Sequence, residues 1–178
     1  YYSGDKTLLY FTLGKIAGKD TAARLGKFVE KGHTVRLYRL FALANLGDAK
    51  ALDQLIDILV AGTLEDKRDA AFLLGGLDVK DAVPRLEALM EKSDDPFTAV
   101  AAASALLAQG EQKAIEYLYK TMSKGVPIVA DEAERALLVA KMEDLDEFLK
   151  GSLKKERNIV TKRRTEEILY RRKPKEFR

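Results

Sequence analysis

Residues 47–51 read Gly-Asp-Ala-Lys-Ala, and altered copies of this pentapeptide recur along the chain of 178 residues. The copies are Gly18-Lys19-Asp20-Thr21-Ala22, Asp78-Val79-Lys80-Asp81-Ala82, Gly110-Glu111-Gln112-Lys113-Ala114 and, more loosely, Lys141-Met142-Glu143-Asp144-Leu145. Their last residues lie at 22, 51, 82, 114 and 145, so the steps are 29, 31, 32 and 31 residues. A repeat of this length is typical of stacked helical hairpins.

Apolar residues at helical spacing lie on both sides of each copy. The copy at 47–51, for example, separates Leu40, Leu43 and Leu46 from Leu52, Leu55 and Leu59. We therefore expect each unit to hold two amphipathic helices joined by a turn. Hairpin ends are expected at Lys31-Gly32, Ala61-Gly62, Lys92-Ser93 and Lys124-Gly125, with the glycines in the left-handed conformation. Prolines 84, 96 and 127 are expected near helix starts, where no amide hydrogen is needed.

These patterns predict an all-α fold, a right-handed α-solenoid of about five helical hairpins with a C-terminal capping helix. The repeat array is predicted over residues 1–156, with units at about 6–32, 33–62, 63–93, 94–125 and 126–156. A basic C-terminal helix and tail are predicted over 157–178. A compact helical bundle is the alternative, but a bundle does not require the regular repetition.

Composition agrees with helices that have one solvated face. Hydrophobic residues make up 47% of the chain and charged residues 33%, and there are four prolines. No apolar run reaches the about 18 residues that a membrane span needs, and the start does not resemble a signal peptide, so we expect a soluble cytoplasmic protein. The absence of cysteine excludes disulfides, thiolate metal sites and cysteine nucleophiles.

Three motifs resemble those of HEAT-like repeats, particularly the short repeats of phycobilin lyase subunits. They are Leu46-Gly47-Asp48, Ala51-Leu52-Asp53-Gln54-Leu55 and Ala82-Val83-Pro84-Arg85-Leu86. The resemblance extends from about Lys6 to Glu156, and Arg36 and Arg68 match an arginine that the family carries early in the first helix. It implies a helical solenoid. It implies no particular activity, because these motifs encode helix packing.

Some HEAT-like proteins are enzymes, and deoxyhypusine hydroxylases bind a di-iron centre through His-Glu pairs. This chain has a single histidine, His33, which is followed by threonine and is expected to cap a helix or to meet solvent. The stretch Leu74-Gly75-Gly76-Leu77 lacks the Lys-Ser/Thr of a nucleotide loop and is expected to serve close packing. We therefore expect no enzyme, no cofactor and no metal site.

The predicted function is a non-catalytic scaffold or adaptor that binds a protein or peptide along the surface of the second helices. Tyr117 is the expected anchor, because a tyrosine brings a large contact area at low entropic cost. The residues expected to project from these helices, away from the core, are Arg24, Lys27, Asp53, Asp57, Arg85, Glu116, Tyr117, Lys120 and Glu147.

The C-terminal segment is strongly basic and supports an alternative function. Residues 150–178 hold 12 Lys and Arg against 4 Glu, whereas the whole chain has a net charge of +3. The segment is either a solvated cap or a site for an anionic partner such as nucleic acid. The residues expected to point outward are Lys162, Arg163, Arg164, Arg171, Arg172 and Lys173. A further alternative is a non-catalytic subunit that assists a partner enzyme, such as a lyase.

The opposite end carries more apolar residues than one partner helix could cover, including Tyr1, Tyr2, Leu8, Leu9 and Phe11. We expect either a longer repeat array or a surface for self-association or peptide binding. The oligomeric state stays open.

Overall fold

A computed structural model describes residues 3–18, 20–25, 27–28, 32–77 and 79–173 of the protein. These residues form eleven α-helices, a short 3₁₀ turn (η1, Lys80–Ala82) and no strand, which confirms the predicted all-α solenoid of five hairpins and a last helix. The helices are α1 (Ser3–Ile16), α2 (Asp20–Leu25), α3 (His33–Asn45), α4 (Ala49–Ala61), α5 (Leu64–Gly75), α6 (Val83–Lys92), α7 (Pro96–Ala108), α8 (Gln112–Lys124), α9 (Pro127–Val139), α10 (Leu145–Lys155) and α11 (Ile159–Arg172).

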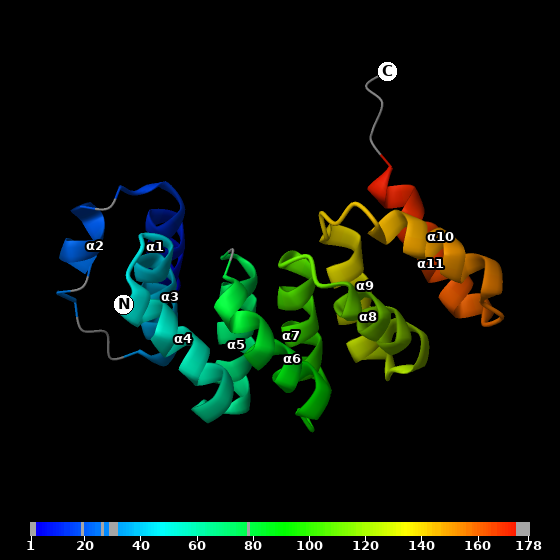
Figure 1. Ribbon diagram of the computed structural model, residues 1–178, viewed down its shortest axis with the longest axis horizontal. Coiled ribbons are helices and arrows are strands. Elements are labelled where there is room, and N and C mark those ends of the chain that lie inside the picture. Colours follow the sequence, from blue (N-terminus) through cyan, green and yellow to red (C-terminus); the bar gives the residue numbers. More distant parts are fainter. Residues whose placement is uncertain (1–2, 19, 26, 29–31, 78, 174–178) are drawn as a thin grey trace, which may run out of the picture.

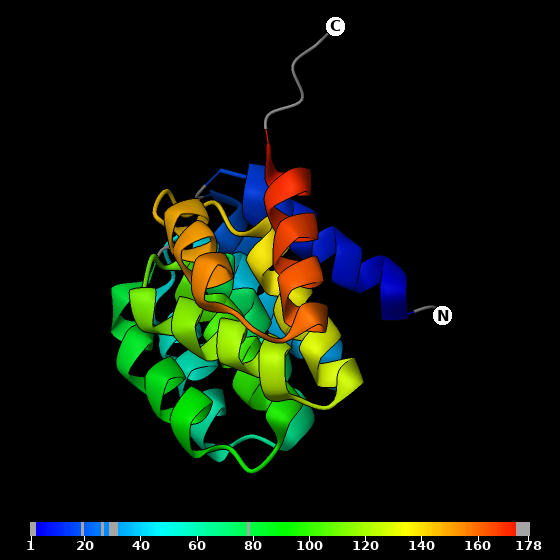
Figure 2. The same ribbon diagram turned by 90° about the vertical axis from the view of Figure 1, so that its right-hand side faces the viewer.

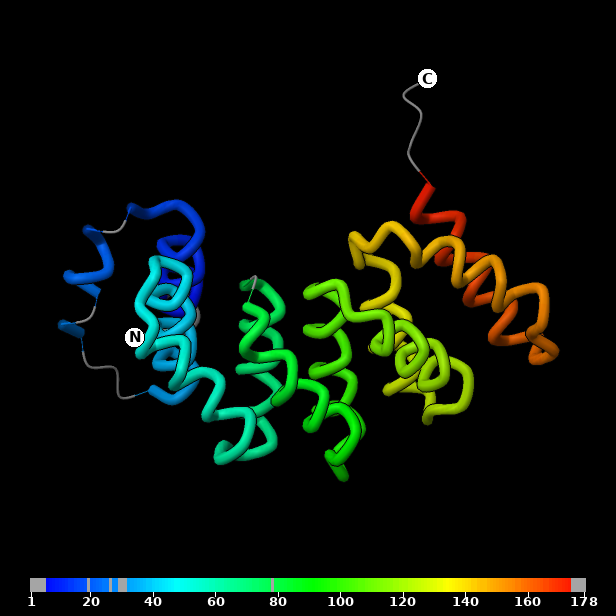
Figure 3. The backbone as a smooth tube through the Cα atoms, in the orientation of Figure 1, coloured from blue at the N-terminus to red at the C-terminus, as the bar shows by residue number. Residues whose placement is uncertain are grey.

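The hairpins lie side by side in an open arc, with α1 and α2 at one end and α10 and α11 at the other (Figure 1). The tube view shows the chain doubling back once in each hairpin before it enters the next one (Figure 3). Helices α1, α3, α5, α7, α9 and α11 form a row in which each member contacts the next. We call α1, α3, α5, α7 and α9 the first helices, and their hairpin partners α2, α4, α6, α8 and α10 the second helices.

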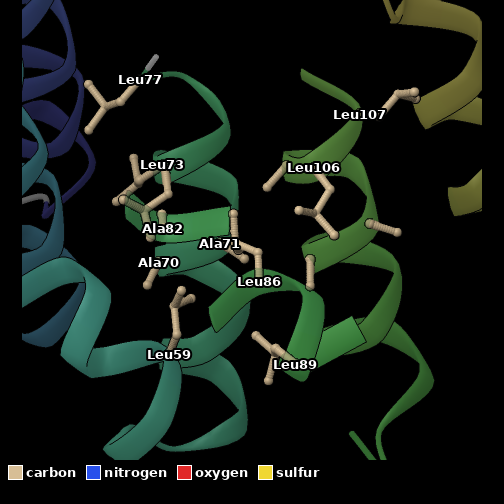
Figure 4. Packing of buried hydrophobic residues seen from close by; sticks show 14 of the residues in the cluster. Leu59, Ala70, Ala71, Leu73, Leu77, Ala82, Leu86, Leu89, Leu106 and Leu107 are labelled. Atoms are coloured by element: carbon tan, nitrogen blue, oxygen red, sulfur yellow. The ribbon is translucent and has the colours of Figure 1, made fainter. Parts of the chain in front are cut away.

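The core is a continuous layer of leucine and alanine between the helices of neighbouring hairpins. Ala71 of α5, Leu86 of α6 and Leu106 of α7 are completely buried and lie close together (Figure 4). Burying one leucine side chain contributes about 1.5–3 kcal/mol, so the many contacts of this kind hold each hairpin to the next.

The turns differ from the prediction in where the left-handed glycines lie. The described glycines with positive φ are Gly47 (φ 95°) and Gly110 (φ 84°), which form the turns inside two hairpins. Gly32, Gly62 and Gly125 at the hairpin ends are extended, so the prediction of left-handed glycines there is wrong. A small residue is needed at Gly125 for another reason, because a Cβ there would lie 2.5 Å from a carbonyl oxygen of the preceding helix. Lys31 lies outside the described residues.

Helix starts follow the sequence closely. Pro84, Pro96 and Pro127 lie in the first turns of α6, α7 and α9, as predicted. Asp95 is the N-cap of α7, and its carboxylate accepts a hydrogen bond of 2.8 Å from the Thr98 amide. Such caps satisfy amide groups that have no partner inside the helix.

The first hairpin is less regular than the others. Its second helix, α2, has six residues, of which Leu25 is buried. On α1, Tyr10 is buried, whereas Leu8, Leu9 and Ile16 are exposed. Tyr1 and Tyr2 lie outside the described residues. Self-association or peptide binding at this end stays a prediction.

The last helix is held to the array by two arginines. Arg164 lies 2.8 Å from both Asp131 and Glu134 of α9. Arg172 lies 2.6 Å from Asp146 of α10 and donates a hydrogen bond to a carbonyl oxygen at the end of α9. An end-on view shows α11 beside α9 (Figure 2). The expectation that these two arginines point outward is therefore wrong, since only 24% and 12% of their side chains are exposed.

No helix within the described ranges is both long and apolar enough to cross a membrane.

Candidate binding groove

An open groove of about 760 Å³ runs across the first helices. Phe11 of α1 and Phe41 of α3 close it at one end, and α5, α7 and α9 supply the rest of its lining. The lining residues on these three helices and at the end of α5 are Arg68, Asp69, Phe72, Leu73, Gly75, Gly76, Phe97, Val100, Ala101, Ser104, Ala105, Ala108, Glu132, Arg135, Ala136 and Val139.

Five of the lining residues occupy the same position in successive first helices. They are Phe11, Phe41, Phe72, Ser104 and Arg135, spaced 30, 31, 32 and 31 residues apart. The rings of Phe11 and Phe41 stack with their centroids 5.3 Å apart. The aromatic row ends at Ser104, whose small side chain leaves the groove hollow above α7.

The floor along α7 is made of small residues, and its two sides carry exposed apolar groups. Ala101, Ser104 and Ala108 follow one another at helical spacing on the floor. Phe72 on the α5 side is 64% exposed, and Val139 on the α9 side is 72% exposed. Covering these side chains would remove apolar surface from water, which is favourable.

Most charges in the groove are already paired. Arg68 lies 3.1 Å from Asp95, and its guanidinium stands 5.4 Å from the centre of the Phe97 ring. Arg135 lies 3.0 Å from Glu132.

Asp69 is different, because its carboxylate has no hydrogen-bond or ion-pair partner among the described residues. Burial raises the pKa of Asp69, and the nearby carboxylates of Glu65 and Asp66 raise it further, whereas Arg68 and His33 lower it by less. The groove therefore contains one unpaired, partly desolvated carboxylate.

Glycines allow the first helices to approach each other closely. A Cβ on Gly75 would lie 3.0 Å from the Ala105 Cα, and a Cβ on Gly14 would lie 2.9 Å from the Ala42 Cα. The two glycines occupy the same position in α5 and α1. The expectation that the stretch from Leu74 to Leu77 serves close packing is confirmed.

The nine residues predicted for the second-helix surface lie elsewhere, and none of them lines this groove. Eight are exposed: Arg24 on α2, Lys27 just after it, Asp53 and Asp57 on α4, Arg85 on α6, Glu116 and Lys120 on α8, and Glu147 on α10. Tyr117 is half-buried and packs against the core, which corrects the expectation that it projects away. Partner binding by these residues stays a prediction.

His33 links two hairpins. Its Nδ1 lies 2.9 Å from the carboxylate of Asp66, which belongs to the capping box of α5. The two residues line a smaller hollow of about 340 Å³ together with Asp57. In the part of the chain that the structure describes, no three or more His, Cys, Asp or Glu side chains gather in a way that could hold a metal ion.

Aligning the first helices at the repeat period would have revealed the row of Phe11, Phe41 and Phe72. Sequence reasoning missed it because each ring, taken singly, is indistinguishable from a core residue. Phe41 is buried and Phe72 is exposed, and this difference depends on the helix that lies above each ring. The sequence alone therefore does not predict the groove.

Comparison with known proteins supports the repeat fold. A family model described as HEAT repeats matches residues 64–138, which run from α5 to the end of α9. The chain is also 32% identical over 105 residues to deoxyhypusine hydroxylase from Danio rerio. That alignment covers 58% of this chain and 34% of the relative, so the chain spans about a third of the relative's length.

The relative is an enzyme, and this finding overturns the expectation that the chain is not one. The match to HEAT repeats and the helical hairpins at the matched residues together show that residues 64–138 are similar to HEAT repeats.

Proposed function

We propose that the chain binds a partner protein and that the groove across α5, α7 and α9 receives it. The observation that carries the proposal is the exposure of Phe72 and Val139 on either side of a floor of small residues. HEAT repeats generally serve as scaffolds for protein interaction, and clustered apolar exposure marks such surfaces.

The groove suits this role better than the surface of the second helices. The residues predicted there, such as Asp53, Asp57 and Arg85, are exposed charges of both signs. Exposed ion pairs contribute at most about 1 kcal/mol each, whereas buried apolar anchors dominate most interfaces.

Site-specific photo-crosslinking tests the proposal. A photoreactive phenylalanine analogue at position 72 is expected to capture a partner from a lysate of the source cells. The matched control places the analogue at Val60, an exposed apolar residue of α4 outside the groove. Equal capture at both positions, or no capture at position 72, would contradict binding in the groove.

The enzyme relative favours a second candidate, a part in the hydroxylation of deoxyhypusine. The test incubates the purified chain with ferrous iron, dioxygen, a reductant and a peptide that contains deoxyhypusine, and mass spectrometry detects the gain of one oxygen atom. Product formation would establish the activity despite the single histidine. If no product forms, the chain resembles the hydroxylase in its repeat scaffold and not in its activity.

The third candidate is the predicted binding of nucleic acid by the basic C-terminal segment. Lys162, Arg163 and Lys173 are exposed and lack ion pairs among the described residues, whereas Arg164 and Arg172 hold α11 in place. Titration of labelled DNA and RNA at two salt concentrations tests it. Phosphate contacts would make the affinity fall steeply with salt, and no binding at low salt would exclude this function.

A further inference from the structure

We propose that the occupant of the groove is an amphipathic α-helix of the partner that lies along α7. It places a large apolar side chain over Ser104 and a lysine or arginine beside Asp69. This inference rests on the proposed function and names the chemistry of the partner.

The groove has the length of a short helix. From Phe97 to Ala108 the floor follows α7 for twelve residues, which are eleven steps of about 1.5 Å, or about 16 Å in all. The hollow continues past the end of α7 into a space of about 320 Å³ that Lys141 and Met142 help to line. An occupant of three or more helical turns therefore fits the length.

The apolar floor favours a helix over an extended segment. The Ser104 hydroxyl donates a hydrogen bond of 2.8 Å to the Val100 carbonyl, and Arg68 and Arg135 already have carboxylate partners. An extended segment would bury amide and carbonyl groups with few partners, which is costly. An α-helix satisfies its backbone groups internally, as in other proteins that bind a helix in a groove.

The small floor residues allow such a helix to approach closely. The same kind of contact already occurs inside the molecule, where Gly75 lies against Ala105. Ser104 stands where the row of Phe11, Phe41 and Phe72 would place its next ring. A large side chain of the occupant over Ser104 would continue this row.

The charged residues of the groove indicate which polar contact the occupant makes. The carboxylate of Asp69 is unpaired, whereas the other charged lining residues pair with each other or with Asp95. A cation on the occupant would compensate the unpaired carboxylate of Asp69.

The test begins with a displayed library of random 16-residue peptides selected on the intact chain. Enriched peptides are expected to carry apolar residues at positions i, i+3, i+4 and i+7 and one basic residue. Binding is expected to weaken at least tenfold with Phe72→Ala and with Ser104→Gln, which fills the floor. Circular dichroism melting of both variants controls for folding.

A charge exchange then tests the contact to Asp69. Asp69→Lys is expected to weaken the selected peptide about tenfold or more, and a peptide with glutamate at its basic position is expected to recover the affinity. The matched control is Asp81→Lys in η1, an exposed position outside the groove, which is expected to leave binding unchanged. Equal effects of the two substitutions, or no recovery, would overturn the pairing.

Other outcomes separate this inference from the proposed function. Enrichment of proline-containing extended motifs, or of helices without a basic residue, overturns the inference and leaves groove binding intact. Self-association that Ser104→Gln abolishes would make a second copy the occupant and would also overturn it. If the library yields no binder although position 72 crosslinks to a partner, the helical occupant is wrong. If both experiments fail, the proposed function is wrong.

Discussion

At the scale of single residues, Asp69 and Asp95 show how the place of an aspartate in the fold shifts the pKa of its carboxyl group. Burial raises the pKa of Asp69, and its acidic neighbours raise it further. Burial would also raise the pKa of Asp95, but hydrogen bonds from Thr98 and from Arg68 lower it more, so the result is below the usual value. The ionised form is thus unfavourable at Asp69 and favourable at Asp95.

The two carboxylates should respond to pH in opposite ways. The folded state binds a proton at Asp69 more tightly than the unfolded state, so ionised Asp69 lowers stability at pH 7. We expect Asp69→Asn to raise the urea midpoint at pH 7. This gain should disappear as the pH falls through the raised pKa, because the native carboxyl is then neutral too.

Asp95→Asn is the control of opposite sign. Its carboxylate contributes stability above the unfolded pKa of about 3.9, and this is lost as the pH falls through the lowered folded value. The substitution should cost about 1 kcal/mol at pH 7, because it removes the charge from the hydrogen bonds to Thr98 and Arg68. Urea titrations at pH 7 and pH 3 measure the midpoints of both variants. A change in the midpoint with the same sign for both variants would contradict this account.

At the scale of helices, each C-terminus in the row of first helices needs partners for its last carbonyl groups. The following hairpin often supplies them. Asn45 of α3 donates to the Gly14 carbonyl, and the Gln109 amide donates to the Leu74 carbonyl at 3.1 Å. Arg172 of α11 donates to the Leu137 carbonyl at 3.1 Å. These contacts join the hairpins in addition to the apolar packing.

The close approach of α5 and α7 makes a glycine necessary at position 75. We expect Gly75→Ala to destabilise the fold by about 1–3 kcal/mol, because the new Cβ would lie 3.0 Å from the backbone of α7. Gly151→Ala in α10 is the matched control, since a Cβ there meets no atom within 4 Å. It should stabilise the fold by up to about 1 kcal/mol. Chemical denaturation measures both, and similar values would show that the helix contact can adjust.

The attachment of α11 depends on Arg172. Replacing it with methionine should lower the free energy of unfolding by about 2 kcal/mol, because it removes a mostly buried guanidinium and its hydrogen bonds to Asp146 and to the end of α9. Hydrogen exchange in residues 159–172 should accelerate. Arg163→Met is a change of the same type at an exposed residue of α11 that has no ion pair with any described residue, and it should leave exchange unchanged. Unaltered protection in the Arg172 variant would show that apolar contacts alone hold the helix.

At the scale of the whole molecule, most contacts between the described helices of the arc join the same or adjacent hairpins, so the stability should vary along its length. Helix α2 has one buried residue, whereas α7 has eight. We expect native-state hydrogen exchange to be fastest in α2 and slowest in α5 and α7. Uniform protection from α1 to α11 would instead indicate a single cooperative unit.

The sequence alone was enough to predict the helical hairpins, because their period of about 31 residues appears in local signals. Prolines at helix starts, apolar spacing and the repeated pentapeptide each act over a few residues and do not depend on distant contacts. The prediction of left-handed glycines names the wrong turns, because glycine is needed for two different reasons. Gly47 has a positive φ, whereas Gly125 lies too close to the backbone of the preceding helix for a side chain.

The location of the groove was decided only by the tertiary structure. Phe41 and Phe72 have equivalent places in the repeat. The ring of Phe11 stacks on Phe41, which is buried, whereas Phe72 is exposed. Likewise, Arg163 and Arg164 are adjacent in a basic run, but only Arg164 meets the carboxylates of α9. Periodicity thus determines which residues share a face of a helix, whereas exposure and charge pairing depend on the element that lies opposite that face.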